Sequence, residues 1–176
     1  MRKIASIFDM LNYPTNLGRL EVNLRSLEVV IRIFLLTNEI GHKETTKFLQ
    51  SLRTLKMDQE VEINQFTSYD PLNKLIEKYN EIVSKLYSEL IINTDIIKLR
   101  DALAHGRAFY LEQSPPYTTM LLLKFSDPNK NKTTLKPKVE ISDVMTKHWL
   151  DEKIKWTQNE YKKVIEASNR ISKIKP

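Results

Sequence analysis

Apolar residues recur at helical spacing over much of the chain, and this pattern constrains the fold more than any other feature. From Leu20 they fall at positions 20, 24, 27, 31 and 34, the period of a helix that buries one face. We expect this helix to end near Gly41. The chain has only 3 glycines. Because glycine is costly inside a helix and useful in tight turns, their scarcity also favours long helices over a β-barrel.

The clearest helix is predicted over residues 70–90, with Asp70 as its N-cap and Pro71 in the first helical position. A continuous apolar stripe runs through it from Leu72 to Leu90. A shorter helix is predicted over residues 44–57, and residues 58–69 have no clear period and are interpreted as a loop. The inward positions predicted for the shorter helix are Phe48, Leu52 and Leu55.

A fourth helix is predicted after Asn93 or Thr94, either of which can serve as its N-cap, and Gly106 is well placed to end it. Its predicted inward residues are Ile96, Leu99 and Leu103. The period then changes. Alternating apolar residues at 121, 123 and 125, and again at 135, 139 and 141, predict a β-hairpin over about residues 118–141 with one lysine-rich face.

Ser142 is the predicted N-cap of a last long helix, whose apolar stripe runs from Leu150 to Ile171. The whole chain, residues 1–176, is therefore predicted to form a single mainly α domain. Its expected architecture is a bundle of four or five helices with the hairpin inserted before the last one. A length of 176 residues suits one domain with one core.

Composition narrows the class of protein. The absence of cysteine excludes disulfides and thiolate metal sites, and no cluster of carboxylates or histidines indicates a metal or another cofactor. The longest apolar run is interrupted by Arg32 and is too short to span a bilayer. Residues 1–10 lack the features of a signal peptide, so we expect a cytoplasmic protein. A net charge of +6 and a pI near 9.4 favour a polyanionic partner.

One stretch contains residues that suggest more than a structural role. This is the sequence LRDALAHGR at residues 99–107. Arg100 and His105 are five positions apart, so on a regular helix they diverge by about 140° around the axis. Asp101 shares a face with His105, so its carboxylate can accept a hydrogen bond from the imidazole and fix its tautomer. Gly106 leaves room beside the histidine for another backbone or a ligand. A purely structural interpretation is also open, because histidine and glycine are common at helix ends.

The residues RDALAH resemble the signature of the HEPN superfamily, an arginine followed after about four to six residues by a histidine. The position after the arginine is commonly Asn, Asp or His in that family, and here it is Asp101. The resemblance implies a helical bundle that acts as a homodimer, in which two copies of the motif face each other and form one site. It also implies a metal-independent endoribonuclease, of the kind found in toxin–antitoxin and antiviral systems.

This resemblance gives each motif residue a role. RNA supplies its own nucleophile, the 2′-hydroxyl, so the protein needs only proton transfer and charge stabilisation. His105 suits the first task because imidazole titrates near neutral pH, and Arg100 suits the second. Asp101 would orient the imidazole. Arg107 stands where toxins paired with a nucleotidyltransferase antitoxin have a tyrosine, so control by nucleotide transfer is not expected, although another protein antitoxin remains open as a partner.

Basic residues beyond the motif are candidates for binding RNA phosphates, and a solvated hairpin face is the alternative for the lysines. Trp149 and Trp156 could stack bases, although packing in the core or at a dimer interface is the simpler interpretation. The alternative function for the whole chain is a non-catalytic HEPN-like module that binds nucleotide, RNA or a protein partner. The candidate RNA contacts are Arg107, Lys124, Lys130, Lys132, Lys136 and Lys138.

Overall fold

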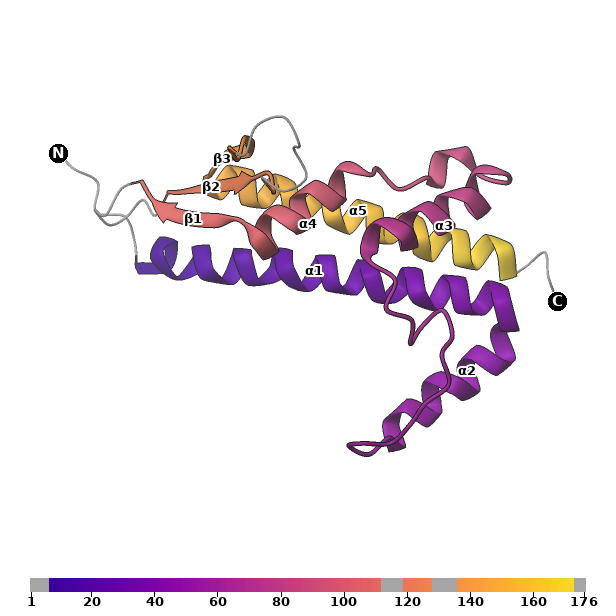
Figure 1. The fold of residues 1–176 in the computed structure, drawn as a ribbon. Coiled ribbons are helices and arrows are strands. Elements are labelled where there is room, and N and C mark those ends of the chain that lie inside the picture. Colours follow the sequence, from indigo (N-terminus) through magenta and orange to yellow (C-terminus); the bar gives the residue numbers. More distant parts are fainter. Residues whose placement is uncertain (1–6, 112–118, 128–135, 173–176) are drawn as a thin grey trace. The chain divides into compact units, whose positions relative to one another are not determined.

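The structure, a computed structural model, describes residues 7–111, 119–127 and 136–172, with side chains from residue 13 onward. Within these ranges the protein is mainly helical, with five α-helices and a small antiparallel sheet before the last helix (Figure 1). The helices are α1 (Ile7–Ile40), α2 (His42–Ser51), α3 (Leu72–Ser84), α4 (Asp95–His105) and α5 (Lys147–Ser172). The strands are β1 (Arg107–Tyr110), β2 (Met120–Phe125) and β3 (Val139–Met145), and two short 3₁₀ turns are η1 (Leu52–Thr54) and η2 (Ser88–Leu90).

The chain forms two compact units. The first comprises residues 1–24 and 95–157, and the second comprises residues 25–94 and 158–176. Helices α1 and α5 each contribute one segment to each unit. Helix α4 and the sheet belong to the first unit, and helices α2 and α3 belong to the second.

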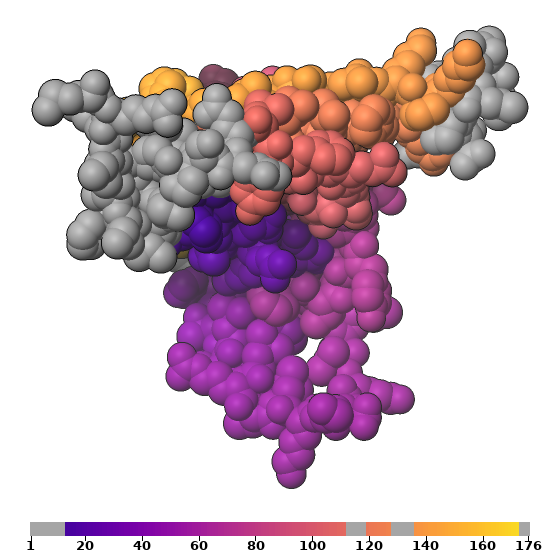
Figure 2. Space-filling model, turned by 90° about the vertical axis from the view of Figure 1, so that its left-hand side faces the viewer, coloured from indigo at the N-terminus to yellow at the C-terminus, as the bar shows by residue number. Residues whose placement is uncertain are grey.

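The first unit combines α4 and the sheet with the opening segments of α1 and α5. Polar side chains join the two long helices, because Asn16 Nδ2 donates to Asp151 Oδ1 at 3.3 Å and Asn23 Nδ2 donates to Thr157 Oγ1 at 3.2 Å. The strand order is β1-β2-β3, antiparallel throughout. Figure 2 shows the region around β1 (red) above the indigo part of α1. The buried apolar residues of this unit include Leu20, Leu24, Ile96, Leu99, Ala102, Leu122, Met145, Leu150 and Ile154.

The sheet differs from the predicted hairpin. Strand β1 is an additional strand, and β3 continues to Met145, so Ser142 lies within a strand instead of capping a helix. The cap of α5 is Thr146, whose Oγ1 accepts a hydrogen bond from the Trp149 backbone N–H at 3.1 Å. The buried residue of β2 is Leu122, at 3 % exposure, instead of the alternating set predicted around it. Pairing with β2 explains the greater length of β3, because ladder hydrogen bonds extend this strand to Met145, beyond the local sequence signal.

In the second unit, the guanidinium of Arg32 anchors the loop between η1 and α3 to α1. Arg32 of α1 donates from Nη1 to the Ser68 carbonyl and from Nη2 to the Asp70 carbonyl, both at 2.8 Å, and also contacts Glu28 at 2.9 Å. Its side chain is only 12 % exposed. A buried charge of this kind needs several hydrogen-bond partners, and Arg32 obtains them by fastening an otherwise irregular segment to α1.

Helix α1 ends at Ile40, as predicted, because Gly41 adopts a φ of 83° that continues no helix. Helix α3 is shorter than predicted. Its buried stripe stops at Val83, and Leu86 is exposed. The predicted cap at Asp70 is wrong. No side chain caps α3, and the Asp70 carboxylate instead accepts a hydrogen bond from Lys78 Nζ at 2.6 Å, which lowers the pKa of Asp70.

The inward positions predicted for the shorter helix are only partly confirmed. Phe48 packs edge to face against Phe66 at 5.7 Å, whereas Leu55 lies beyond η1 and is 39 % exposed. The core of this unit lies around α3, where the rings of Phe34 and Tyr79 meet at 4.9 Å. Burial, and secondly the nearby Glu160 carboxylate, raise the pKa of the Tyr79 hydroxyl.

Gly106 allows α4 to end directly against the sheet. Its N–H donates to the Ala102 carbonyl at 2.7 Å and so completes the last turn of the helix. A Cβ at this position would overlap the Ala102 carbonyl oxygen and would lie 3.0 Å from both Leu122 Cδ1 and the Leu123 carbonyl oxygen. The expected space beside the histidine is therefore filled by the backbone of β2.

We expect Gly106→Ala to lower the free energy of unfolding by about 1–3 kcal/mol, because the added methyl group overpacks a contact with backbone. The matched control is Gly18→Ala in α1, where nothing lies within 4 Å of the added Cβ. That substitution should stabilise by about 0.5–1 kcal/mol through helix propensity. Urea unfolding of both variants, followed by far-UV circular dichroism, measures the difference. Equal effects of the two substitutions would contradict the close packing at Gly106.

Candidate functional site

The predicted motif lies in the last two turns of α4. Ile96, Leu99 and Ala102 bury one side of this helix, and the motif side chains therefore project from the remaining surface. The side chain of Arg100 is 41 % exposed and that of Asp101 is 37 % exposed. The structure thus holds the arginine and the carboxylate on a rigid helical element with access to solvent.

Asp101 contacts two cations. Its Oδ1 accepts a hydrogen bond from Arg100 Nη1 at 3.2 Å, and its Oδ2 lies 3.8 Å from Lys124 Nζ of β2. The ammonium of Lys124 also lies 3.3 Å from Glu140 of β3. An ion chain therefore runs from α4 across two strands. Among the residues that the structure describes, Asp101 makes no hydrogen bond to His105, so the predicted orientation of the imidazole by this carboxylate is absent from the single chain.

His105 is the last residue of α4 and is exposed. Its imidazole makes no hydrogen bond or ion pair with any side chain or backbone group in the described ranges. Gly106 follows it, and the chain then turns directly into β1. Both ring nitrogens are therefore available to a ligand, which is what a proton-transfer group needs.

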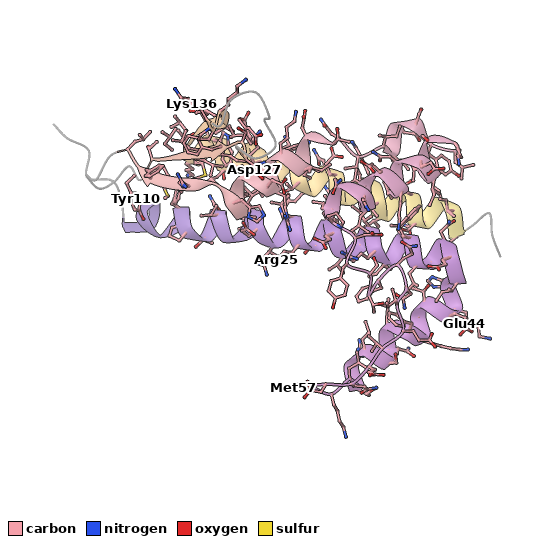
Figure 3. All side chains as sticks on the ribbon, viewed as in Figure 1. Arg25, Glu44, Met57, Tyr110, Asp127 and Lys136 are labelled. Carbon is pink, nitrogen blue, oxygen red and sulfur yellow. The ribbon has the colours of Figure 1, made fainter. Side chains whose placement is uncertain are left out.

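The predicted RNA-binding residues differ in their surroundings. Arg107 is exposed and its guanidinium stacks over the Phe125 ring at 5.5 Å. Lys136 and Lys138 are exposed, and Figure 3 shows Lys136 pointing away from the strands. The Lys124 side chain is only 20 % exposed and already has two carboxylate partners, so it is less available to a phosphate than the others. Lys130 and Lys132 lie outside the described residues.

Two features near the motif were not predicted. Glu140 is the second partner of Lys124, a pairing that depends on strand register and leaves no local signal. The second feature is on α5, where Lys153 Nζ lies 5.6 Å from the ring centre of Trp149 and 5.2 Å from that of Trp156. The spacings of four and three residues along a helix would have indicated this contact.

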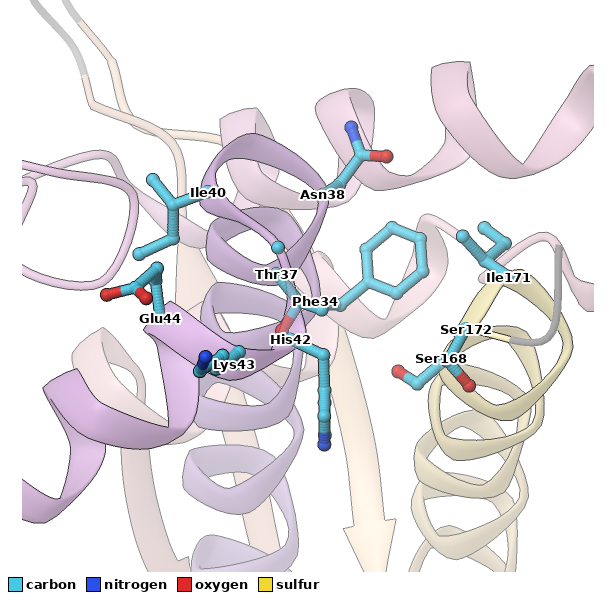
Figure 4. A pocket seen from close by; sticks show the side chains of 11 residues that line it. Phe34, Thr37, Asn38, Ile40, His42, Lys43, Glu44, Ser168, Ile171 and Ser172 are labelled. Carbon is cyan, nitrogen blue, oxygen red and sulfur yellow. The ribbon is translucent and has the colours of Figure 1, made fainter. Parts of the chain in front are cut away.

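The second unit contains a separate cavity of about 620 Å³. It lies between the end of α1, the start of α2 and the end of α5, with Phe34 and Ile171 on its walls and His42 at its edge (Figure 4). Its lining is mainly apolar, and no residue of the predicted catalytic or RNA-binding set belongs to it.

In residues 7–111, 119–127 and 136–172 there is no group of three or more His, Asp or Glu side chains that could hold a metal ion. None of the helices in those ranges is sufficiently long and apolar to cross a membrane.

Comparisons with protein-family models, curated proteins and solved structures found no match to this chain. The assignment of a function therefore rests on the motif, its resemblance to the HEPN signature and the geometry around α4.

We expect Lys124→Met to reduce the free energy of unfolding by about 1 kcal/mol, because it leaves the carboxylates of Asp101 and Glu140 without their shared cation. Methionine keeps most of the apolar stem, so the loss isolates the charge. Lys136→Met is the matched control, since this exposed lysine has no carboxylate partner among the described residues, and its effect should stay within about 0.5 kcal/mol. Denaturant unfolding compares the two, and equal stabilities would mean that the ion chain contributes nothing.

Proposed function

We propose that the protein is a metal-independent endoribonuclease of the HEPN type that acts as a homodimer. The observation that carries this proposal is the exposed imidazole of His105, which has no partner among the described residues and ends the helix that bears Arg100. An imidazole with both nitrogens accessible, in a segment that also carries Arg100 and Arg107, suits cleavage of a phosphodiester that has its own nucleophile.

The proposed chemistry balances without a metal. The imidazole of His105 takes the proton of the 2′-hydroxyl, and the 2′-oxygen attacks the adjacent phosphorus. The bond from phosphorus to the 5′-oxygen breaks, and the imidazolium returns its proton to that departing oxygen. Arg100 stabilises the negative charge that grows on the non-bridging phosphate oxygens. The products are a 2′,3′-cyclic phosphate and a free 5′-hydroxyl.

Geometry within one chain favours a site made by two copies. Arg100 and His105 diverge by about 140° on a regular helix, and the guanidinium of Arg100 is turned toward its neighbour Asp101. Two copies of α4 facing each other across a two-fold axis would bring His105 of one chain to the partner subunit's Arg100. In such a dimer both groups reach one phosphate without unwinding the helix.

The exposed cations suit a substrate strand. Arg107 begins β1 one residue after the motif histidine and Gly106, and Lys136 and Lys138 are exposed in the segment just before β3. Contacts of this kind position a phosphate backbone without reading its sequence. A toxin or an antiviral effector is the biological role that the resemblance suggests for such an activity.

Purified protein should cleave single-stranded RNA in the presence of EDTA and leave DNA intact, because DNA lacks the 2′-hydroxyl. His105→Ala should lose about 10²–10⁴-fold in rate, the usual effect of removing a positioned acid–base group. Arg100→Ala should lose about 10²–10³-fold through lost charge stabilisation. The assay follows a labelled oligoribonucleotide and identifies the cyclic phosphate by mass spectrometry.

His148→Ala is the matched control, since this exposed histidine of α5 pairs with Glu152 at 3.4 Å and lies outside the motif. It should cleave at the wild-type rate. Cleavage at an undiminished rate by His105→Ala would place the activity elsewhere. If the wild-type protein binds RNA but never cleaves it, the non-catalytic module is the better account.

A further inference from the structure

A second cavity lies in the first unit, beside the motif helix. It has a volume of about 350 Å³ and is lined by α4, β2, β3 and α5. Its apolar base includes Leu99 and Leu122, which are 6 % and 3 % exposed. The half-buried indole of Trp156 forms part of its wall. A depression of this size, with an apolar base and a polar edge, suits a small planar ligand.

Two opposite charges line this cavity without being paired. Asp143 of β3 lies directly across from Leu122 in the ladder, and cross-strand partners share a face of the sheet, so its carboxylate is on the cavity side. Asp143 is half-buried, and its carboxylate makes no hydrogen bond or ion pair within the described part of the chain. The ammonium of Lys153 of α5 lies over the indole rings of Trp149 and Trp156 and has no carboxylate partner within the described part of the chain.

The other charges at the cavity edge are already neutralised. Glu140 pairs with Lys124 at 3.3 Å, and Lys98 pairs with Asp95 at 2.8 Å. A ligand therefore meets one available carboxylate, which can only accept hydrogen bonds, and one available ammonium, which can only donate them. The ligand that satisfies both must present two donors on one edge and an acceptor next to them.

Among the RNA bases, guanine has this pattern. Its N1–H and N2–H groups point the same way and can donate to both oxygens of one carboxylate, and its O6 and N7 are acceptors for an ammonium. Uracil offers a single N–H between two carbonyl oxygens, which would repel the second carboxylate oxygen. Adenine and cytosine place a ring-nitrogen acceptor beside their amino group, with the same result.

We propose that this cavity binds a guanine base, with Asp143 accepting from its N1–H and N2–H groups and Lys153 donating to O6 or N7. The cavity is connected to the motif through the ion chain, since Glu140 lines the cavity and Lys124 links it to Asp101. If the cavity recognises a base of an RNA substrate, this proposal rests on the proposed function. If it binds a free guanine nucleotide, the proposal does not require that the protein cleaves RNA.

Binding can be measured without any cleavage. The chain has two tryptophans. Trp156 lines the cavity, and Trp149 lies near the same Lys153 ammonium, so a base bound there should quench tryptophan fluorescence. Titration of the full-length protein with guanosine monophosphate should quench the signal with an affinity at least about tenfold tighter than for uridine monophosphate. Asp143→Asn, which keeps the shape and removes the charge, should weaken binding of the guanine nucleotide about tenfold to a hundredfold.

The matched control is Glu152→Gln, which removes an exposed carboxylate of α5 that does not line the cavity. It should bind like the wild type.

A second experiment distinguishes the two sources of guanine, an RNA strand and a free nucleotide. His105→Ala protein is titrated with a short oligouridylate and with the same strand carrying one guanosine. If the strand that carries guanosine binds more tightly than guanosine monophosphate, RNA is the ligand. If the two bind equally, the ligand is a free nucleotide.

Equal affinity for guanosine and uridine monophosphate, no quenching by either, or unchanged binding by Asp143→Asn would each overturn the guanine site. If Asp143→Asn fails to fold, the preference of the wild-type protein between the two nucleotides still tests the guanine site.

Failure of the guanine site can be distinguished from failure of the proposed function. Loss of the guanine site leaves cleavage dependent on His105, whereas a guanine-binding protein that cuts no RNA retains this site and loses the ribonuclease proposal.

Discussion

The contact between Gly106 and the backbone of β2 is the constraint on which the candidate site depends. Because no side chain fits between the end of α4 and the Leu123 carbonyl, the helix stops there and the chain turns at once into β1. The register that follows, with Arg107 opposite Leu123, fixes both residues relative to α4. His105 is thereby held at the last helical position, exposed, with a guanidinium on each side of it in the sequence.

The same packing gives α4 one surface that faces solvent and one that lines the cavity. The solvent-facing surface of α4 carries Arg100, Asp101 and His105, which we propose to form the cleavage site together with a second copy, and Leu99 on its buried side contributes to the base of the cavity beside β3. The Asp101–Lys124–Glu140 chain joins these sides electrostatically. In this account the cavity selects a base and the motif acts on an adjacent phosphate, so that recognition and chemistry are built from one helix and the sheet that it packs against.

Local patterns predicted the parts of this arrangement that depend on neighbours in sequence. The end of α1 at Ile40, the buried stripe of α3 and the end of α4 before Gly106 all follow from helical spacing and glycine placement. Contacts between distant residues could not be predicted in this way. Asp70 pairs with Lys78 instead of capping α3, and Asp101 meets Lys124, which is brought to it only by the register of β2. Strand β1 is short and wholly exposed, so it has no alternating pattern to detect.

The central claim is that one site is made by two copies of the motif, and mixing two inactive variants tests it most directly. Arg100→Ala and His105→Ala protein, differently tagged, are unfolded together, refolded and purified through both tags to isolate mixed dimers, about half of the total if pairing is random. Each mixed dimer contains an intact His105 in one chain and an intact Arg100 in the other. The account predicts that these dimers cleave RNA although neither variant does so alone. Mixed dimers that stay as inactive as their parents would contradict it, because they would place Arg100 and His105 in a site formed within a single chain.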